Sequence, residues 1–144
     1  PTFALATLPS LRPLHKPLAA PPTILLVEDN ETNISTFSDY LQARGYRVQI
    51  ARNGQEAMDR LAESTPDLVL LDIQMPGMDG LEVMHLVRSE KQWALLPIVA
   101  LTALAMPGDR ERCLAAGANA YLSKPISLKL LISTIETHLK RSKE

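Results

Sequence analysis

Residues 67–72 read Asp-Leu-Val-Leu-Leu-Asp, a short apolar run that ends in an acidic residue. Similar runs recur along the chain, and longer amphipathic segments separate them. This alternation predicts repeated strand–helix units around a parallel sheet, an α/β fold. Each of the other runs is also followed by a charged or hydroxylated residue: residues 24–27 precede Glu28 and Asp29, residues 98–101 precede Thr102, and residues 120–123 precede Lys124.

Five strand–helix units fit the sequence from residue 23 onward. Gly45 and Gly117 each follow a helical segment, where a left-handed cap residue is usually needed. The predicted strands are residues 23–27, 47–51, 68–71, 97–101 and 119–122, and the predicted helices are residues 32–44, 54–64, 80–90, 107–116 and 127–141.

The bulk composition predicts one domain. The 144 residues, 46% of them apolar, are enough for one sizeable core. A net charge of −1 gives no basic field, so we expect no direct binding of nucleic acid. No apolar stretch approaches the roughly 20 residues that span a bilayer, so we expect no membrane insertion by this segment. The single cysteine, Cys113, fits a reducing cytoplasm.

The first 22 residues differ from the rest of the chain. Residues 9–22 hold five of the eleven prolines and show neither helical nor strand periodicity, which predicts an extended linker. We therefore expect an N-terminal arm and linker over residues 1–22, a remnant of a preceding domain if the chain is a piece of a longer protein, and one domain over residues 23–144. The absence of an initial methionine suits either such a piece or methionine removal.

The polar residues after the predicted strands suggest a metal site. The carboxyl ends of parallel strands meet at one edge of a sheet, where ligands bind. Two like charges about 4 Å apart repel by roughly 4 kcal/mol at an effective dielectric near 20, so Glu28, Asp29 and Asp72 need a compensating cation. Lys124 supplies one charge, and a metal ion would supply the rest.

Mg²⁺ is the metal that this ligand set favours, because the candidate ligands are hard oxygens. We expect Asp29 and Asp72 to bind it directly, Glu28 to bind through water, and the backbone carbonyl of Gln74 to complete the site. A metal beside a carboxylate suits phosphoryl transfer, and transfer onto Asp72 would form an acyl phosphate.

These motifs closely resemble the receiver domain of two-component response regulators, over about residues 22–142. The resemblance implies a flavodoxin-like, doubly wound, five-stranded parallel sheet with strand order 2-1-3-4-5. It also implies a cis peptide bond before Pro125. The matching stretches are residues 25–30, 66–80, 97–103 and 117–125.

The resemblance also implies a role for each site residue. Asp72 matches the phosphoacceptor, Lys124 the phosphate-binding ammonium, and Glu28 with Asp29 the acidic pair. Thr102 matches the switch hydroxyl, which moves toward a new phosphoryl group. The remaining match is the switch aromatic, Tyr121, whose ring fills the vacated space and reshapes the partner-binding surface.

The implied partner is a histidine kinase, whose phosphohistidine donates the phosphoryl group to Asp72. A histidine phosphotransfer protein could receive it next, and phosphorylation could drive dimerisation. We favour the C-terminal receiver of a hybrid sensor histidine kinase, with a free-standing single-domain regulator as the alternative. Such a module is a phosphoryl acceptor rather than a turnover enzyme.

Three other functions compete with this interpretation. A haloacid-dehalogenase-type phosphatase needs an acid two residues after its nucleophile, and Gln74 occupies that position here. A flavodoxin-like nucleotide-binding module needs amide donors after the first strand, where Glu28 and Asp29 would repel a phosphate. A receiver-like scaffold that binds partners without phosphorylation is disfavoured by the intact set of Asp, Thr and Lys, but only chemistry can exclude it.

Overall fold

The computed structural model describes residues 20–143, apart from residues 76, 78 and 104–105. Most of the predicted N-terminal arm, residues 1–19, lies outside the described residues. The described chain forms one five-stranded parallel sheet in the order β3-β2-β4-β5-β6, which is the predicted order 2-1-3-4-5. Its strands are β2 (Thr23–Val27), β3 (Arg47–Ala51), β4 (Leu68–Asp72), β5 (Ile98–Thr102) and β6 (Ala120–Ser123).

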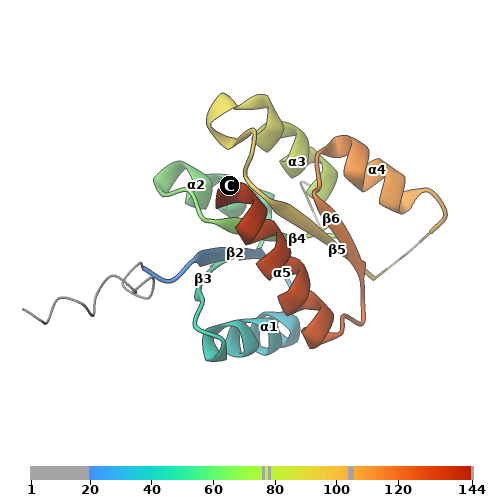
Figure 1. Cartoon of the computed structure of the whole chain (residues 1–144). Helices are drawn as coiled ribbons and strands as arrows, with labels where there is room; N and C mark the ends of the chain where they lie inside the picture. Colours follow the sequence, from blue (N-terminus) through green and yellow to red (C-terminus); the bar gives the residue numbers. More distant parts are fainter. Residues whose placement is uncertain (1–19, 76, 78, 104–105, 144) are drawn as a thin grey trace, which may run out of the picture.

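Helices cover both faces of this sheet, with α1 and α5 on one face and α2, α3 and α4 on the other (Figure 1). Successive side chains of β2, β4 and β5 alternate between these two helical layers, so the central strands are buried on both sides. The predicted doubly wound α/β fold is confirmed. The helices are α1 (Glu31–Ala43), α2 (Gly54–Glu63), α3 (Gly80–Ser89), α4 (Asp109–Ala116) and α5 (Leu128–Lys143).

The observed element boundaries lie within two residues of the predicted ones. The fourth helix begins at Asp109 rather than at residue 107, because Gly108 caps it in the left-handed region with φ +87°. The sequence analysis also missed a short 3₁₀ helix, η3 (Lys91–Trp93), between α3 and β5. None of the helices among the described residues is both long enough and apolar enough to cross a membrane.

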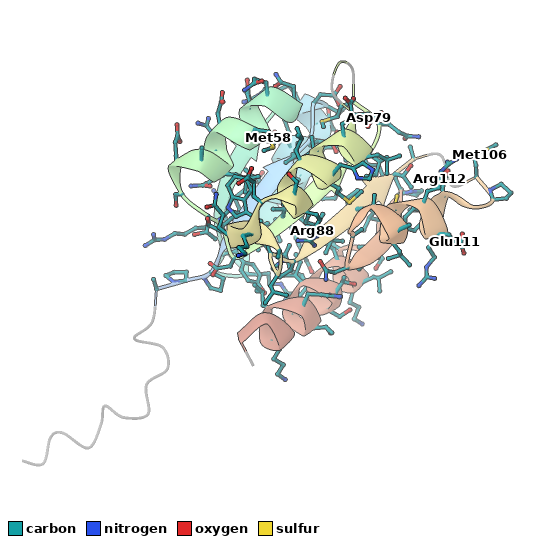
Figure 2. All side chains as sticks on the ribbon, turned by 90° about the horizontal axis from the view of Figure 1, so that it is seen from above. Met58, Asp79, Arg88, Met106, Glu111 and Arg112 are labelled. Carbon is teal, nitrogen blue, oxygen red and sulfur yellow. The ribbon has the colours of Figure 1, made fainter. Side chains whose placement is uncertain are left out.

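Arg88 ties the end of α3 to two neighbouring segments, and Figure 2 shows it near the C-terminal end of that helix. Its Nε and Nη2 atoms donate to the Gly117 carbonyl at 3.0 and 2.7 Å. Its Nη1 atom donates to the carbonyls of Trp93 and Leu96 at 2.9 and 2.8 Å. One guanidinium therefore satisfies carbonyls of both the α4–β6 turn and the α3–β5 connection.

We expect Arg88→Ala to lower the free energy of unfolding by about 2–4 kcal/mol, because it leaves several carbonyls without their charged donor. Urea unfolding followed by circular dichroism measures this loss. The control is Arg52→Ala, which removes an exposed ion pair with Glu31 and should cost far less, because solvent screens the two charges. Equal losses in the two variants would contradict the structural role of Arg88.

Candidate functional site

The register of the sheet brings the predicted site residues to one edge. Val27 of β2 lies opposite Leu71 of β4, so the next residues, Glu28 and Asp72, are neighbours. On the far side of β4, Thr102 ends β5 opposite Ser123, which precedes Lys124. β2 and β4 flank the point where strand order reverses, which is where open α/β sheets bind ligands.

Lys124 joins the two buried carboxylates of the site. Its Nζ atom lies 3.0 Å from Glu28 Oε1 and 3.2 Å from Asp72 Oδ2. Glu28 is only 1% exposed and Asp72 only 3%. The backbone amides of Asn30 and Gln74 add hydrogen bonds to Glu28 Oε2 (3.2 Å) and Asp72 Oδ1 (2.9 Å). Both acids are thus oriented by a shared cation and by local backbone donors.

Burial raises the pKa of Asp72 from 3.8 to about 6, and the negative charge of Glu28 adds to this rise. The amide of Gln74 and the ammonium of Lys124 partly offset it. For Lys124, burial lowers the pKa, but the hydrogen bond with Glu28 and the charge of Asp72 outweigh burial and raise it overall. At neutral pH the site therefore holds an ionised Asp72 at a cost in folding free energy.

This cost predicts a pH-dependent gain in stability for Asp72→Asn. Between about pH 4 and pH 6, Asp72 is protonated in the folded protein but ionised in the unfolded chain. The free energy of unfolding therefore falls as the pH rises through that window. Above pH 6 the metal-free variant should be more stable than the wild type by on the order of 1–2 kcal/mol, and the difference should shrink toward pH 4. Thermal unfolding of both proteins from pH 4 to pH 8 in a chelator tests this; a pH-independent difference would contradict it.

The acidic residues can hold a divalent cation. Carboxylate oxygens of Glu28, Asp29 and Asp72 all lie within 4.8 Å of one another. Asp29 is exposed whereas Glu28 and Asp72 are buried, so the cluster opens to solvent on the Asp29 side. These three carboxylates supply hard oxygen ligands, which Mg²⁺ prefers.

Gln74 also lies at the site. The sequence analysis did not predict the hydrogen bonds that its backbone amide and its side chain make there. Its amide donates to Asp72, and its side-chain Oε1 accepts a hydrogen bond from the Ala103 amide at 3.1 Å. The predicted role of its backbone carbonyl as a metal ligand stays a prediction. No sequence pattern signals the Gln74 side-chain bond, because it joins two loops 29 residues apart.

Thr102 and Tyr121 border a cavity of about 240 Å³ beside the acidic cluster. Thr102 is 2% exposed, and the Tyr121 side chain packs half-buried against the core. Gln74 lines the same cavity. The predicted switch hydroxyl is therefore a buried group at the border of this cavity, while the switch roles of both residues stay predictions. The bond between Lys124 and Pro125 is cis, as the resemblance implies.

Comparisons with known proteins agree with this fold. The family model described as response regulator receiver domain matches residues 24–136. The polar-differentiation response regulator DivK from Brucella anthropi is 44% identical over 119 residues, which cover 83% of this chain and 97% of that protein.

Two solved structures extend the comparison. The receiver domain of sensor histidine kinase PA1611 from Pseudomonas aeruginosa PAO1, solved with a magnesium ion in its active site cleft, is 36% identical with a TM-score of 0.78; the match covers 84% of this chain and 99% of that chain. The chemotaxis protein CheY4 from Vibrio cholerae is 31% identical with a TM-score of 0.78, and the match covers 82% of this chain and 98% of that chain. The chain therefore belongs to the family of response regulator receiver domains, which act in two-component signalling.

Proposed function

We propose that Asp72 accepts a phosphoryl group from a phosphohistidine of a histidine kinase in a magnesium-dependent reaction. The observation that carries this proposal is the buried Asp72 carboxylate, bound to Lys124 and adjacent to the oxygens of Glu28 and Asp29. A structural ion pair would not need two further acids beside it, since they raise the electrostatic cost of the site.

The side chains supply most of what this reaction requires. A carboxylate oxygen of Asp72 forms the new O–P bond while the N–P bond of phosphohistidine breaks, and the bonding electron pair remains on the imidazole nitrogen. Lys124 binds a phosphoryl oxygen, and the Thr102 hydroxyl lies at the same strand edge to bind another. Bound Mg²⁺, held by Asp29, Asp72 and the Gln74 carbonyl with Glu28 acting through water, would neutralise the charge that builds up on the phosphoryl oxygens.

The metal should bind more weakly in acid, because it needs an ionised Asp72. With the pKa of Asp72 near 6, we expect the apparent Kd for Mg²⁺ to be nearly constant above pH 7 and to rise by up to about tenfold per pH unit below pH 6. Isothermal titration calorimetry from pH 5 to pH 8 measures this profile. Asp29→Asn should weaken binding at every pH, whereas binding unaffected by Asp29→Asn would contradict the proposed ligand set.

The proposed downstream events are those that the sequence predicts. Phosphorylation would draw Thr102 inward and let Tyr121 follow, which changes the surface formed by α4, β6 and α5. A histidine phosphotransfer protein or a second phosphorylated copy would bind the changed protein. The placement of the chain in a hybrid kinase stays a prediction, as does its division into a linker and a domain at residue 22.

The direct test is the intact mass of the chain after incubation with acetyl phosphate and Mg²⁺. We expect one added phosphoryl group, and none when the metal is chelated. A cognate kinase with a radiolabelled phosphohistidine provides a second donor. If neither donor modifies the folded protein, the chain is a receiver-like binding module that works without phosphorylation.

A further inference from the structure

The peptide group between Thr102 and Ala103 lies at the carboxyl end of β5, next to the end of β4 that carries Asp72. Two residues hold this peptide group. Its carbonyl oxygen accepts a hydrogen bond from the Lys124 backbone amide at 2.6 Å, and its N–H donates to the side-chain Oε1 of Gln74 at 3.1 Å. The same two residues also contact the Asp72 carboxylate.

Lys124 and Gln74 each connect this peptide group to a different oxygen of Asp72. The Lys124 ammonium lies 3.2 Å from Asp72 Oδ2, and the Gln74 backbone amide donates to Asp72 Oδ1 at 2.9 Å. The backbone that carries the Thr102 hydroxyl is thus linked to both oxygens of the acid. A group added to Asp72 would therefore act on both links.

The link through Gln74 is the weaker of the two. The bond from the Lys124 amide continues the pairing of β5 with β6 beyond Thr102 and Ser123. The other link depends on a side chain, and Gln74 and Ala103 are both exposed, so water can replace either partner. A neutral hydrogen bond of this kind adds little to folding stability, because water offers an equivalent bond in the unfolded chain. The bond between Gln74 and Ala103 can therefore be exchanged at low cost.

We propose that Gln74 is a positioning residue, which holds the Ala103 amide in the unphosphorylated protein and releases it to a phosphoryl group on Asp72. The inference rests on the proposed phosphorylation of Asp72. A charged phosphoryl oxygen accepts an amide hydrogen bond more strongly than the neutral side-chain carbonyl of Gln74 does. The Ala103 amide lies one glutamine side chain away from the amide that already binds Asp72, which is within reach of a group added to that carboxylate.

Release of this amide would let Thr102 move. Thr102 is 2% exposed and borders the cavity of about 240 Å³ that Gln74 and Tyr121 also line. While the Ala103 N–H is bonded to Gln74, the peptide group that follows Thr102 keeps its unphosphorylated orientation. The bond therefore favours the unphosphorylated conformation, and its removal shifts the population toward the phosphorylated one.

Gln74→Met should therefore speed phosphorylation. Methionine has nearly the length of glutamine and leaves the backbone groups of residue 74 in place, but its thioether is only a weak acceptor. One neutral hydrogen bond corresponds to about three- to tenfold in an equilibrium constant, so we expect acetyl phosphate with saturating Mg²⁺ to modify the variant about three- to tenfold faster than the wild type. Intact mass of quenched samples gives the two rates. A residue that merely supported the site would slow the reaction when replaced.

Asp109→Ala is the matched control, because it loosens the other end of the segment between β5 and α4. Asp109 Oδ2 accepts a hydrogen bond from the Met106 amide at 2.9 Å, and this bond involves neither Gln74 nor Ala103. We expect Asp109→Ala to be phosphorylated at close to the wild-type rate. Equal acceleration in both variants would overturn the proposal, since general loosening of the segment would then explain it.

Solvent exchange of the Ala103 amide, measured by NMR, tests the hydrogen bond itself. In the unphosphorylated protein, Gln74→Met should speed this exchange about three- to tenfold, and Gln74→Glu, which keeps an acceptor oxygen at the same reach, should restore slow exchange. With acetyl phosphate and Mg²⁺ present, the amide should be equally protected in the wild type and in Gln74→Met, because a phosphoryl oxygen is then the acceptor in both.

Two results would overturn this inference while leaving the proposed function intact. The first is a wild type that is phosphorylated no more slowly than folded Gln74→Met, and the second is an Ala103 amide that loses protection when the wild type is phosphorylated. If the wild type takes up no phosphoryl group from acetyl phosphate or from a kinase, the proposed function fails and this inference fails with it. The amide spectrum of each variant shows whether it is folded.

Discussion

Asp72→Asn is expected to take up no phosphoryl group under conditions that modify the wild type fully. Asparagine has nearly the same shape as aspartate, so the variant should keep the fold and even gain stability at neutral pH. Its amide cannot form the acyl phosphate, and the neighbouring Glu28 is buried against Lys124 with its oxygens already bonded. Intact mass after incubation with acetyl phosphate and Mg²⁺ measures the loss.

The matched control for this variant is Asp39→Asn, which makes the same chemical change at an exposed position on α1. It should be phosphorylated at the wild-type rate. If Asp72→Asn accepted a phosphoryl group while remaining folded, the acceptor would be another residue, and the role assigned to Asp72 would be wrong.

Lys124→Met should slow phosphoryl transfer by on the order of 10²-fold or more, since it removes the cation that contacts Asp72. It should also destabilise the metal-free protein by about 3–5 kcal/mol at pH 8, because Glu28 and Asp72 are left as buried like charges without their shared partner. The loss of stability should become smaller near pH 5, where Asp72 takes up a proton.

Lys124→Arg separates the two effects. It keeps the positive charge and should recover most of the stability, but its planar guanidinium cannot place a point charge where the ammonium lies, so transfer should stay slow. Rates come from quenched mass measurements with saturating acetyl phosphate, and stabilities come from urea unfolding. A Lys124→Met protein that transfers at the wild-type rate would show that the ion pair is purely structural.

The fold and the main site residues were predictable because both follow from where the strands lie in the sequence and where they end. Short apolar runs locate the strands, and parallel strands bring the residues that follow them to one edge, so Asp72, Thr102 and Lys124 could be grouped without coordinates. Asn53 and Asp79 occupy the N-cap positions of α2 and α3, where their side chains accept amide hydrogen bonds.

Other contacts were not predictable, because they join loops whose separation no periodicity controls. Arg88 forms a hydrogen bond with Gly117, which lies 29 residues away in the sequence. Gln74 forms one with Ala103, which is also 29 residues away in the sequence. The sequence also does not distinguish buried Glu28 from exposed Asp29, since the strand ends at Val27, just before both residues, and the alternation of faces stops there. The left-handed Gly108 moved the start of α4 for a similar local reason.

The location of the phosphoryl group is the measurement that tests the central claim most directly. The protein is phosphorylated with acetyl phosphate and Mg²⁺, reduced with borohydride, which converts an aspartyl phosphate to homoserine, and digested for peptide mass analysis. We predict homoserine at position 72 and unmodified aspartate at positions 29 and 67. Homoserine at another position, or phosphorylated protein that yields none, would contradict the assignment of Asp72 as the phosphoacceptor.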